Sequence, residues 1–297
     1  MVDNKQLNIL VTGGKGFLGQ HLTKALEVRG HRVTSFDIVD GQDLLDYNAV
    51  EKAVQGKDAV YHLAAVADLN WAREHPRETM DINIVGTINV ADACTKHKAI
   101  LHYASTCCAY GNPDTHPVDE TTHPKPTEIY AHSKLAGEHV ILGYASHFGL
   151  HYTMLRLATF YGEGMRAALA PFVFLKQAMR GEPITIHGTG EQTRTFTHVS
   201  DIVEGTARVV DSGVTNEIIN ITTEEEVSVN EMAHLALSLT GSNSKIIHIA
   251  DRPGQIHKEE IRAAKAERLL GWKAKTKFAD GLASSYAWMK AHNLHEL

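Results

Sequence analysis

The chain has 297 residues, 43% of them hydrophobic, and a formal net charge of −6, so it can bury the core of one large or two closely joined domains. No basic block and no apolar stretch of membrane-spanning length occurs, so neither nucleic acid nor a membrane is an expected partner. Three cysteines without CxxC spacing, 19 scattered histidines and no secretory leader predict a reducing cytoplasmic setting and no metal site.

The N-terminal stretch combines an apolar strand with a glycine-rich turn. Residues 8–19 read NILVTGGKGFLG, where Gly13, Gly16 and Gly19 follow a β-branched run at three-residue intervals and precede apolar residues at helical spacing. In such a turn the first glycine permits the tight bend, the second admits a pyrophosphate, and the third lets helix and strand pack closely. The free N–H groups of the helix N-terminus favour phosphate oxygens. This stretch therefore predicts a dinucleotide site.

An acidic residue strengthens that prediction. The next expected strand, residues 31–40, contains Asp37, eighteen residues after Gly19. A carboxylate there accepts hydrogen bonds from a ribose 2′-hydroxyl and repels a 2′-phosphate, so NAD is favoured over NADP. The alternative is an ordinary strand–helix turn with an exposed aspartate; Lys15 is not placed as a P-loop requires.

Strand and helix patterns alternate through the rest of the first half, which predicts an α/β, doubly wound parallel sheet of the Rossmann type. The expected elements are a third unit beginning at 43–46 with a helix over 47–55, strands over 58–65, 99–106 and 151–160, and helices over 78–97 and 129–149. We expect a dinucleotide-binding domain over 1–160. A smaller mixed α/β substrate region should span 161–297, with segments near 194–215, including a helix capped by Ser200, returning to the first domain.

The helix after a turn-rich loop begins with Tyr130 and Lys134, four residues apart and hence on one face. A tyrosine hydroxyl has a reference pKa of about 10, so it acts as a base near pH 7 only with help from a neighbouring ammonium. Ser105 or Thr106, at the end of the preceding strand, would orient a substrate oxygen. The alternative is an ordinary amphipathic helix with a half-buried tyrosine and a solvated lysine.

These residues belong to a set of motifs along the whole chain. The set comprises TGGKGFLG at 12–19, HLAA at 62–65, STCCAYG at 105–111, YAHSK at 130–134, LRLATFYG at 155–162, TRTFTHVSD at 193–201, RPG at 252–254 and AERLLGW at 266–272. Together they resemble the extended short-chain dehydrogenase/reductases, in their NAD-dependent, UDP-glucose 4-epimerase-like branch of nucleotide-sugar epimerases and dehydratases.

The resemblance implies specific site residues. Thr106, Tyr130 and Lys134 would be catalytic, Tyr130 and Lys134 also touching the cofactor. Thr106, Thr159, Arg194 and Arg252 would bind a nucleotide-diphosphate sugar, although Thr159 stands where the family usually has asparagine. The implied NAD-binding residues are Gly13, Gly16, Phe17, Leu18, Gly19, Asp37, Asp43, Leu44, Leu63, Ala64, Ala65 and Asn83. Asn83 would lie on the helix behind the site, and the equal alternative for it is an inward polar residue that bonds the backbone. A homodimer joined through helices 76–97 and 129–147 is also implied.

The reaction is predicted from the two residues that follow Thr106. Family members that dehydrate carry Asp and Glu there, and those that decarboxylate a sugar acid carry Glu at the second position. This chain has Cys107 and Cys108, whose thiols are weak hydrogen-bonding groups and poor substitutes for carboxyls. We therefore expect 4-epimerisation through a transient 4-keto sugar. The alternatives are a sugar dehydrogenase, ketoreductase or dehydratase, or a non-catalytic dinucleotide-binding regulator.

Overall fold

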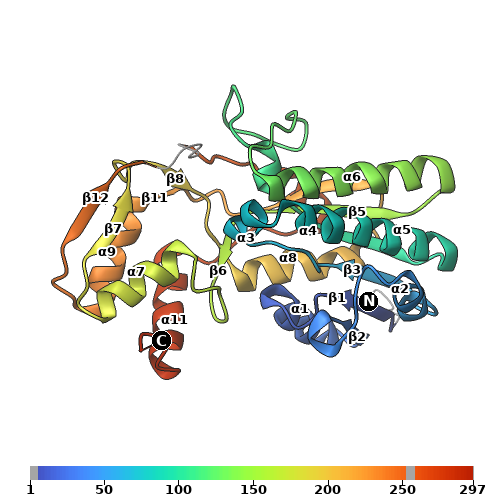
Figure 1. The fold of residues 1–297 in the computed structure, drawn as a ribbon, viewed down its shortest axis with the longest axis horizontal. Coiled ribbons are helices and arrows are strands. Elements are labelled where there is room, and N and C mark those ends of the chain that lie inside the picture. Colours follow the sequence, from blue (N-terminus) through green and yellow to red (C-terminus); the bar gives the residue numbers. More distant parts are fainter. Residues whose placement is uncertain (1–5, 252–257, 297) are drawn as a thin grey trace.

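A six-stranded parallel sheet forms the centre of the protein in the computed structural model, which describes residues 6–251 and 258–296 (Figure 1). The strand order is β10-β5-β4-β3-β1-β2, and every neighbouring pair is parallel. The strands are β1 (Asn8–Thr12), β2 (Arg32–Phe36), β3 (Ala59–His62), β4 (Ile100–Thr106), β5 (Tyr152–Leu157) and β10 (Glu217–Ile221).

Helices cover both faces of this sheet, which confirms the doubly wound α/β prediction (Figure 1). One face carries α2 (Tyr47–Val54), α5 (Gly86–His97) and α6 (Ile129–Phe148), whose apolar side chains share a core with Leu101 and Met154. The other face carries α1 (Phe17–Val28) and α8 (Val199–Ser212), which pack with strand residues such as Ile9 and Ile219. Burial on both faces explains the continuous apolar run of β1, whose residues Ile9, Leu10 and Val11 are all buried.

The third expected unit and the cap of one helix differ from the prediction. Residues 43–46 form no strand; after the 3-10 helix η1 (Ile38–Asp40), Asp46 caps α2 by accepting a hydrogen bond from the Ala49 N–H at 3.1 Å. The sixth strand of the sheet is instead β10, which pairs with β5. His198, not Ser200, caps α8, because its imidazole accepts from the Ser200 N–H.

The helix predicted over 78–97 is divided into segments. It runs through α4 (Pro76–Met80), the π-helical turn η2 (Asp81–Val85) and α5. The short helix α3 (Leu69–Glu74) precedes it, and the 3-10 helix η3 (Cys107–Tyr110) follows β4. Across the described residues, no helix is both long enough and apolar enough to cross a bilayer.

The second half of the chain builds a smaller mixed region beside the sheet (Figure 1). Its core includes Phe172, Leu175, Met232 and Leu282. Three short strand pairs form there: β6 (Phe160–Tyr161) with β9 (Thr197–His198), β7 (Ile184–His187) with β12 (Ile246–Ile249), and β8 (Thr193–Arg194) with β11 (Val227–Ser228). The helices of this region are α7 (Ala170–Met179), α9 (Val229–Thr240) and α11 (Phe278–Ala291), whereas α10 (Ala264–Leu270) packs against α8 and β10.

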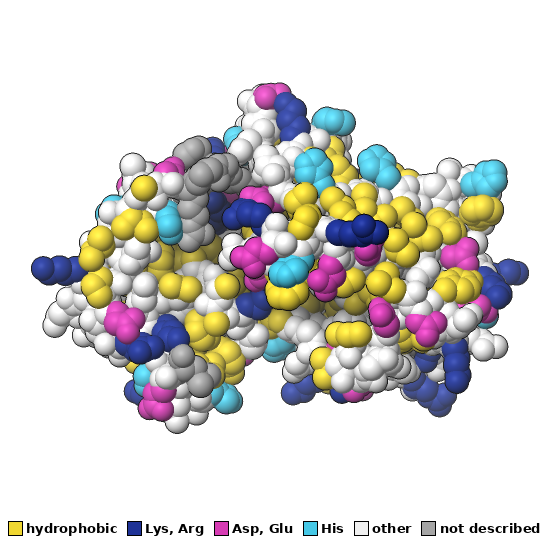
Figure 2. All heavy atoms as spheres, in the orientation of Figure 1, with side chains coloured by type: hydrophobic (Ala, Val, Ile, Leu, Met, Phe, Trp, Pro, Cys, Tyr) yellow, Lys and Arg dark blue, Asp and Glu magenta, His cyan; other side chains and the backbone are white. Residues whose placement is uncertain are grey.

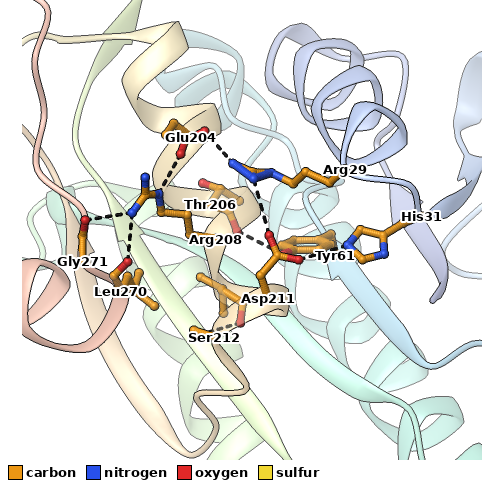
Figure 3. Close-up of polar contacts among 11 residues, drawn as sticks. Arg29, His31, Tyr61, Glu204, Thr206, Arg208, Asp211, Ser212, Leu270 and Gly271 are labelled. Carbon is orange, nitrogen blue, oxygen red and sulfur yellow. Dashed lines mark hydrogen bonds and ion pairs between the residues drawn. The ribbon is translucent and has the colours of Figure 1, made fainter. Parts of the chain in front are cut away.

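Ion pairs fix the returning helix α8 to the N-terminal part of the fold (Figure 3). Arg29 donates to Glu204 at 2.5 Å, and His31 lies 3.1 Å from Asp211. Arg208 donates to Glu204 at 2.6 Å and to the Gly271 carbonyl at 2.8 Å, which joins α8 to the end of α10. These contacts hold α8, which leads into the last strand β10, against the N-terminal part of the fold.

Lys98 ends α5 in a left-handed conformation, with φ 57° and ψ 32°. Glycine adopts this conformation without the Cβ penalty, so Lys98→Gly is expected to raise the free energy of unfolding by about 0.5–1 kcal/mol. Lys52→Gly, at an exposed position inside α2, should lower it by about 1 kcal/mol. Urea denaturation of both variants checks the pair, and a loss of stability in Lys98→Gly would contradict the assignment.

Candidate active site

A cavity of about 590 Å³ runs along the carboxyl ends of the parallel strands. In an open α/β sheet this edge is where ligands bind. The cavity gathers most of the residues predicted from sequence, namely Gly13, Gly16, Phe17, Leu18, Gly19, Asp37, Asp43, Leu44, Leu63, Ala64, Ala65, Thr106, Tyr130, Lys134 and Thr159. Residues far apart in the chain therefore line one continuous groove.

At one end of the cavity, the glycine turn brings backbone against backbone. Gly13 has φ +71°, and a Cβ added there would lie 2.8 Å from the Ala64 backbone. A Cβ on Gly19 would lie only 2.0 Å from the Gly13 carbonyl oxygen. Gly16 is the N-cap of α1 and has no side chain, so no N-cap side chain occupies the first-turn N–H groups of that helix. This geometry is the tight turn with close helix–strand packing that the glycine spacing predicted.

Asp37 is held beside that turn by backbone donors. Its Oδ2 accepts from the Lys15 N–H at 2.9 Å and its Oδ1 from the Val39 N–H at 3.0 Å. The Lys15 ammonium pairs with Asp40 across the same loop. A carboxylate is thereby oriented at the β2 end of the cavity.

At the other end, Lys134 is buried against the sheet. Its side chain is 2% exposed, and its ammonium lies 4.0 Å from the centre of the Tyr103 ring. Burial lowers the pKa of Lys134 to about 7, while the charge of Glu138 acts in the opposite direction. The ammonium is thus poised to change charge near neutral pH.

Tyr130 and Thr106 meet at the same end. Thr106 Oγ1 accepts from the Cys108 N–H at 3.1 Å, which fixes the hydroxyl at the end of β4. Burial, and then the neighbouring Cys108, raises the pKa of Tyr130, whereas hydrogen bonding to Thr106 and the charge of Arg166 lower it. The phenol in this cofactor-free arrangement is neutral, so its use as a base requires further positive charge nearby.

Two predicted residues do not line the cavity. Asn83 lies in η2, where its side chain bonds both the N–H and the carbonyl of Val66, at 2.8 and 3.0 Å, and donates to Ser133 Oγ at 2.8 Å. It therefore reaches the cavity only through Val66, a lining residue. Arg194, on β8, donates to the Thr193 carbonyl at 2.7 Å, and its Nε lies 3.9 Å from Glu259. Arg252 falls outside the described residues.

The sequence prediction missed several lining residues that come from loops. Arg166 donates to the Ala67 carbonyl at 3.1 Å and lies 3.4 Å from Asp68, so it bridges two loops beside the cavity. Ile38 and Val39 line the Asp37 end, although they are 68% and 73% exposed. The signal available in the sequence was the pair of aliphatic residues that directly follows the predicted ribose-binding aspartate. Within the described part of the chain, no group of three or more His, Cys, Asp or Glu is placed to hold a metal ion.

The chain matches known proteins over this whole arrangement. The model of the NAD dependent epimerase/dehydratase family matches residues 9–222. A UDP-N-acetyl-alpha-D-glucosaminuronate decarboxylase of Bacillus cytotoxicus is 36% identical over 81% of this chain and 82% of its own length.

Solved structures agree with this assignment. The UDP-glucose 4-epimerase of Thermotoga maritima with UDP-glucose is 28% identical, with a TM-score of 0.92 over 97% of this chain and 100% of that one. The UDP-glucuronic acid 4-epimerase of Bacillus cereus, in complex with UDP-glucuronic acid and NAD, is 28% identical, with a TM-score of 0.90 over 96% and 100%.

Burial of Lys134 makes stability depend on pH. Its pKa is about 7 in the folded protein and about 10.4 in an unfolded chain, so between these values the unfolded state binds more protons. Stability from this group is therefore lost as pH falls towards 7, by up to about 1.4 kcal/mol per pH unit. The free energy of unfolding of the cofactor-free protein, minus that of Lys134→Met, should rise by about 2–3 kcal/mol from pH 7 to 9. Urea denaturation measures this difference, and a constant difference would contradict the shift.

Proposed function

This chain belongs to the NAD dependent epimerase/dehydratase family, and we propose that within it the protein epimerises a nucleotide-diphosphate sugar at C4. The observation that carries the proposal is the convergence of Thr106, Tyr130 and Lys134 on one end of the cavity, with the glycine turn and Asp37 at the other. The cofactor of this NAD-dependent family would span these two ends.

The residues present fit that cofactor. The turn in which a Cβ on Gly13 or Gly19 would strike backbone leaves room for a pyrophosphate against the N-terminus of α1. Asp37 would accept hydrogen bonds from the adenosine ribose, with Asp43 and Leu44 beside the adenine. Phe17, Leu18 and residues 63–65 would line the path to the nicotinamide. Asn83 would act from behind the site by holding Val66.

The protein's own side chains would remove a proton from the substrate and return it. When bound, NAD would accept a hydride from C4 of the sugar and return it. Thr106 would hydrogen-bond the C4 oxygen, and Tyr130 would take its proton as the general base and give it back after the sugar turns over. Lys134 would favour the phenolate through its charge and bind the nicotinamide ribose. The positive charge of the oxidised cofactor would also lower the pKa of Tyr130.

The neighbouring thiols support epimerisation over dehydration. Cys107 is buried and donates to the Arg156 carbonyl at 3.2 Å, and burial raises the pKa of its thiol well above the ordinary value. Burial likewise raises the pKa of Cys108. Both thiols are therefore neutral at pH 7, and neither supplies the carboxyl group with which dehydrating members transfer a second proton.

Decarboxylation of a UDP-sugar acid is the second candidate, because the Bacillus cytotoxicus relative bears that name at 36% identity. A ketoreductase or dehydrogenase acting on the same substrates would instead consume the cofactor stoichiometrically. A non-catalytic regulator does not need Tyr130 and Lys134 together at the cavity, so the geometry weighs against it.

The substrate would bridge the two regions of the chain. Residues 1–160, with the segments returning near 194–215, would bind NAD, and residues 161–297 would hold the nucleotide. Thr159 would contact the sugar, while Arg194 and Arg252 would bind the diphosphate through their planar forks. The 3.9 Å approach of Glu259 to Arg194 would orient that guanidinium before substrate arrives.

A second copy of this chain is the proposed partner. Hydrophobic side chains gather over α4–α6 on the face shown in Figure 2. Val85, Leu142 and Phe148 are exposed on η2 and α6. Pairing of these helices with their equivalents would cover them and give a homodimer.

Tyr130→Phe tests the base. The variant keeps the ring but loses the ionisable hydroxyl, so kcat should fall by at least about 100-fold while NAD affinity stays within a few-fold. Tyr144→Phe is the matched control, because Tyr144 lies on the same helix but bonds Asp92 at 3.3 Å, and its turnover should be unchanged. Isothermal titration with NAD and a turnover assay separate the two effects. Undiminished turnover in Tyr130→Phe would exclude the proposed base.

A substrate panel tests the reaction. Incubation with UDP-glucose, UDP-N-acetylglucosamine and UDP-glucuronic acid should convert at least one to its 4-epimer, seen by NMR, without net change in absorbance at 340 nm, because NAD is regenerated. Release of carbon dioxide with formation of a UDP-pentose would show decarboxylation instead. Stoichiometric NADH formation would show a dehydrogenase.

A further inference from the structure

A third ionisable residue lies on the helix face that carries Tyr130 and Lys134. Glu138 comes one turn after Lys134 in α6 and is 2% exposed. Its carboxylate accepts from Arg156 Nε at 2.9 Å and from the second Arg156 nitrogen at 2.7 Å, and it also accepts from Ser105 Oγ. The arrangement is a bidentate, fully buried ion pair with one additional hydroxyl donor.

This ion pair joins the elements that hold the proposed catalytic groups. Glu138 belongs to α6, Ser105 directly precedes Thr106 on β4, and Arg156 lies on β5. Arg156 also donates to the Tyr110 hydroxyl at 3.1 Å, and that hydroxyl donates to Asn220 Oδ1, on β10, at 2.7 Å. The pair therefore sets the position of α6 against β4, and with it the separation of Tyr130 from Thr106.

We propose that Glu138, held by Arg156, is a positioning residue that keeps the Lys134 ammonium charged and aligned with Tyr130. The proposal rests on the Tyr130–Lys134 chemistry proposed above. It adds a residue that lies outside the cavity and touches neither substrate nor cofactor.

The surroundings of Lys134 single out Glu138 as its source of negative charge. From β4 the ammonium meets the Tyr103 ring, whose pKa is raised by burial, so that the phenol is neutral. From β3 it meets His62, whose pKa is lowered to about 3 by burial and then by the Lys134 charge, so that the imidazole is neutral near pH 7. On α6 itself the titratable neighbours are Tyr130 and Glu138. Among the described residues, Glu138 is the group whose charge raises the Lys134 pKa against the effect of burial.

Bonding of His62 explains why it does not share this role. Thr87 Oγ1 donates to the Asn83 carbonyl at 2.6 Å, so it accepts from His62 Nε2, 3.1 Å away. His62 Nδ1 then accepts from the Thr12 hydroxyl at 2.7 Å. Both ring nitrogens are satisfied in the neutral form, which agrees with the pKa of His62 being lowered by burial.

The test compares two variants that break the same ion pair with opposite charge. Glu138→Gln leaves the Arg156 cation and removes the anion near Lys134, whereas Arg156→Gln leaves the anion without its cation. A purely structural role predicts the same effect for both. An electrostatic role predicts that the Lys134 titration moves downward in Glu138→Gln, by about 1 pH unit, and upward in Arg156→Gln.

The readout is the titration of Lys134 in protein with ¹³Cε-labelled lysine, saturated with NAD and followed by NMR, with Lys134→Met to assign the signal. The alkaline limb of kcat/KM against pH should move with the same signs. Shifts in one direction for both variants, or no shift, would overturn the proposal.

A buried charge left alone can prevent folding, so the double variant Glu138→Gln/Arg156→Gln is included. It leaves neither Glu138 nor Arg156 charged without its ion-pair partner, and comparison with Arg156→Gln alone isolates the effect of the carboxylate on Lys134. Its Lys134 titration should lie below that of Arg156→Gln, and equal values would refute the role of Glu138. If the substrate panel yields no 4-epimer while these titrations move as stated, the proposed epimerisation fails and the control of the Lys134 charge by Glu138 stands.

Discussion

Burial of the Lys134 ammonium is the constraint on which the functional end of this protein depends. A charged lysine at 2% exposure is unfavourable unless nearby groups compensate, and here burial lowers its pKa to about 7. The Tyr103 ring and the Glu138 carboxylate provide that compensation from β4 and from α6. A site built in this way holds a group that can change its charge near neutral pH, which is a common property of catalytic centres.

The fold supplies this environment by joining distant parts of the chain. β4 and α6 carry the reactive side chains, but β5 provides Arg156, and β10 provides the Asn220 contact at the end of the same polar network. β10 is added to the sheet by a segment that returns after the smaller region, and α8 is tied back by Arg29 and His31 (Figure 3). The same strand, β10, therefore completes the sheet and supports the polar network beside the site.

The choice of reaction depends on fewer residues than the choice of cofactor. Under the proposed function, the glycine turn and Asp37 would hold NAD, and the Tyr130–Lys134 pair would serve the proton transfer. Both a relative named as a decarboxylase, at 36% identity, and solved structures named as epimerases, at 28% identity, match this chain. Under the proposed function, the distinction depends on single side chains such as Cys108, where a thiol stands in place of the carboxyl that decarboxylating members are expected to carry.

Local sequence determined the elements that follow from short sequence patterns. The glycines at three-residue spacing, the apolar strands and the Tyr130–Lys134 pair predicted the parallel sheet and placed Gly13, Asp37, Thr106 and Tyr130 at one edge of it. These features could be predicted because turn geometry, strand burial and helical spacing are short-range properties.

Only the tertiary structure decided the rest. The replacement of the expected third strand by β10 and the withdrawal of Asn83 from the cavity depend on contacts between residues distant in sequence. The same holds for the Glu138–Arg156 pair, whose members are 18 positions apart and lie on a helix and a strand. Their pairing follows from the packing of α6 on the sheet, which no short-range pattern encodes.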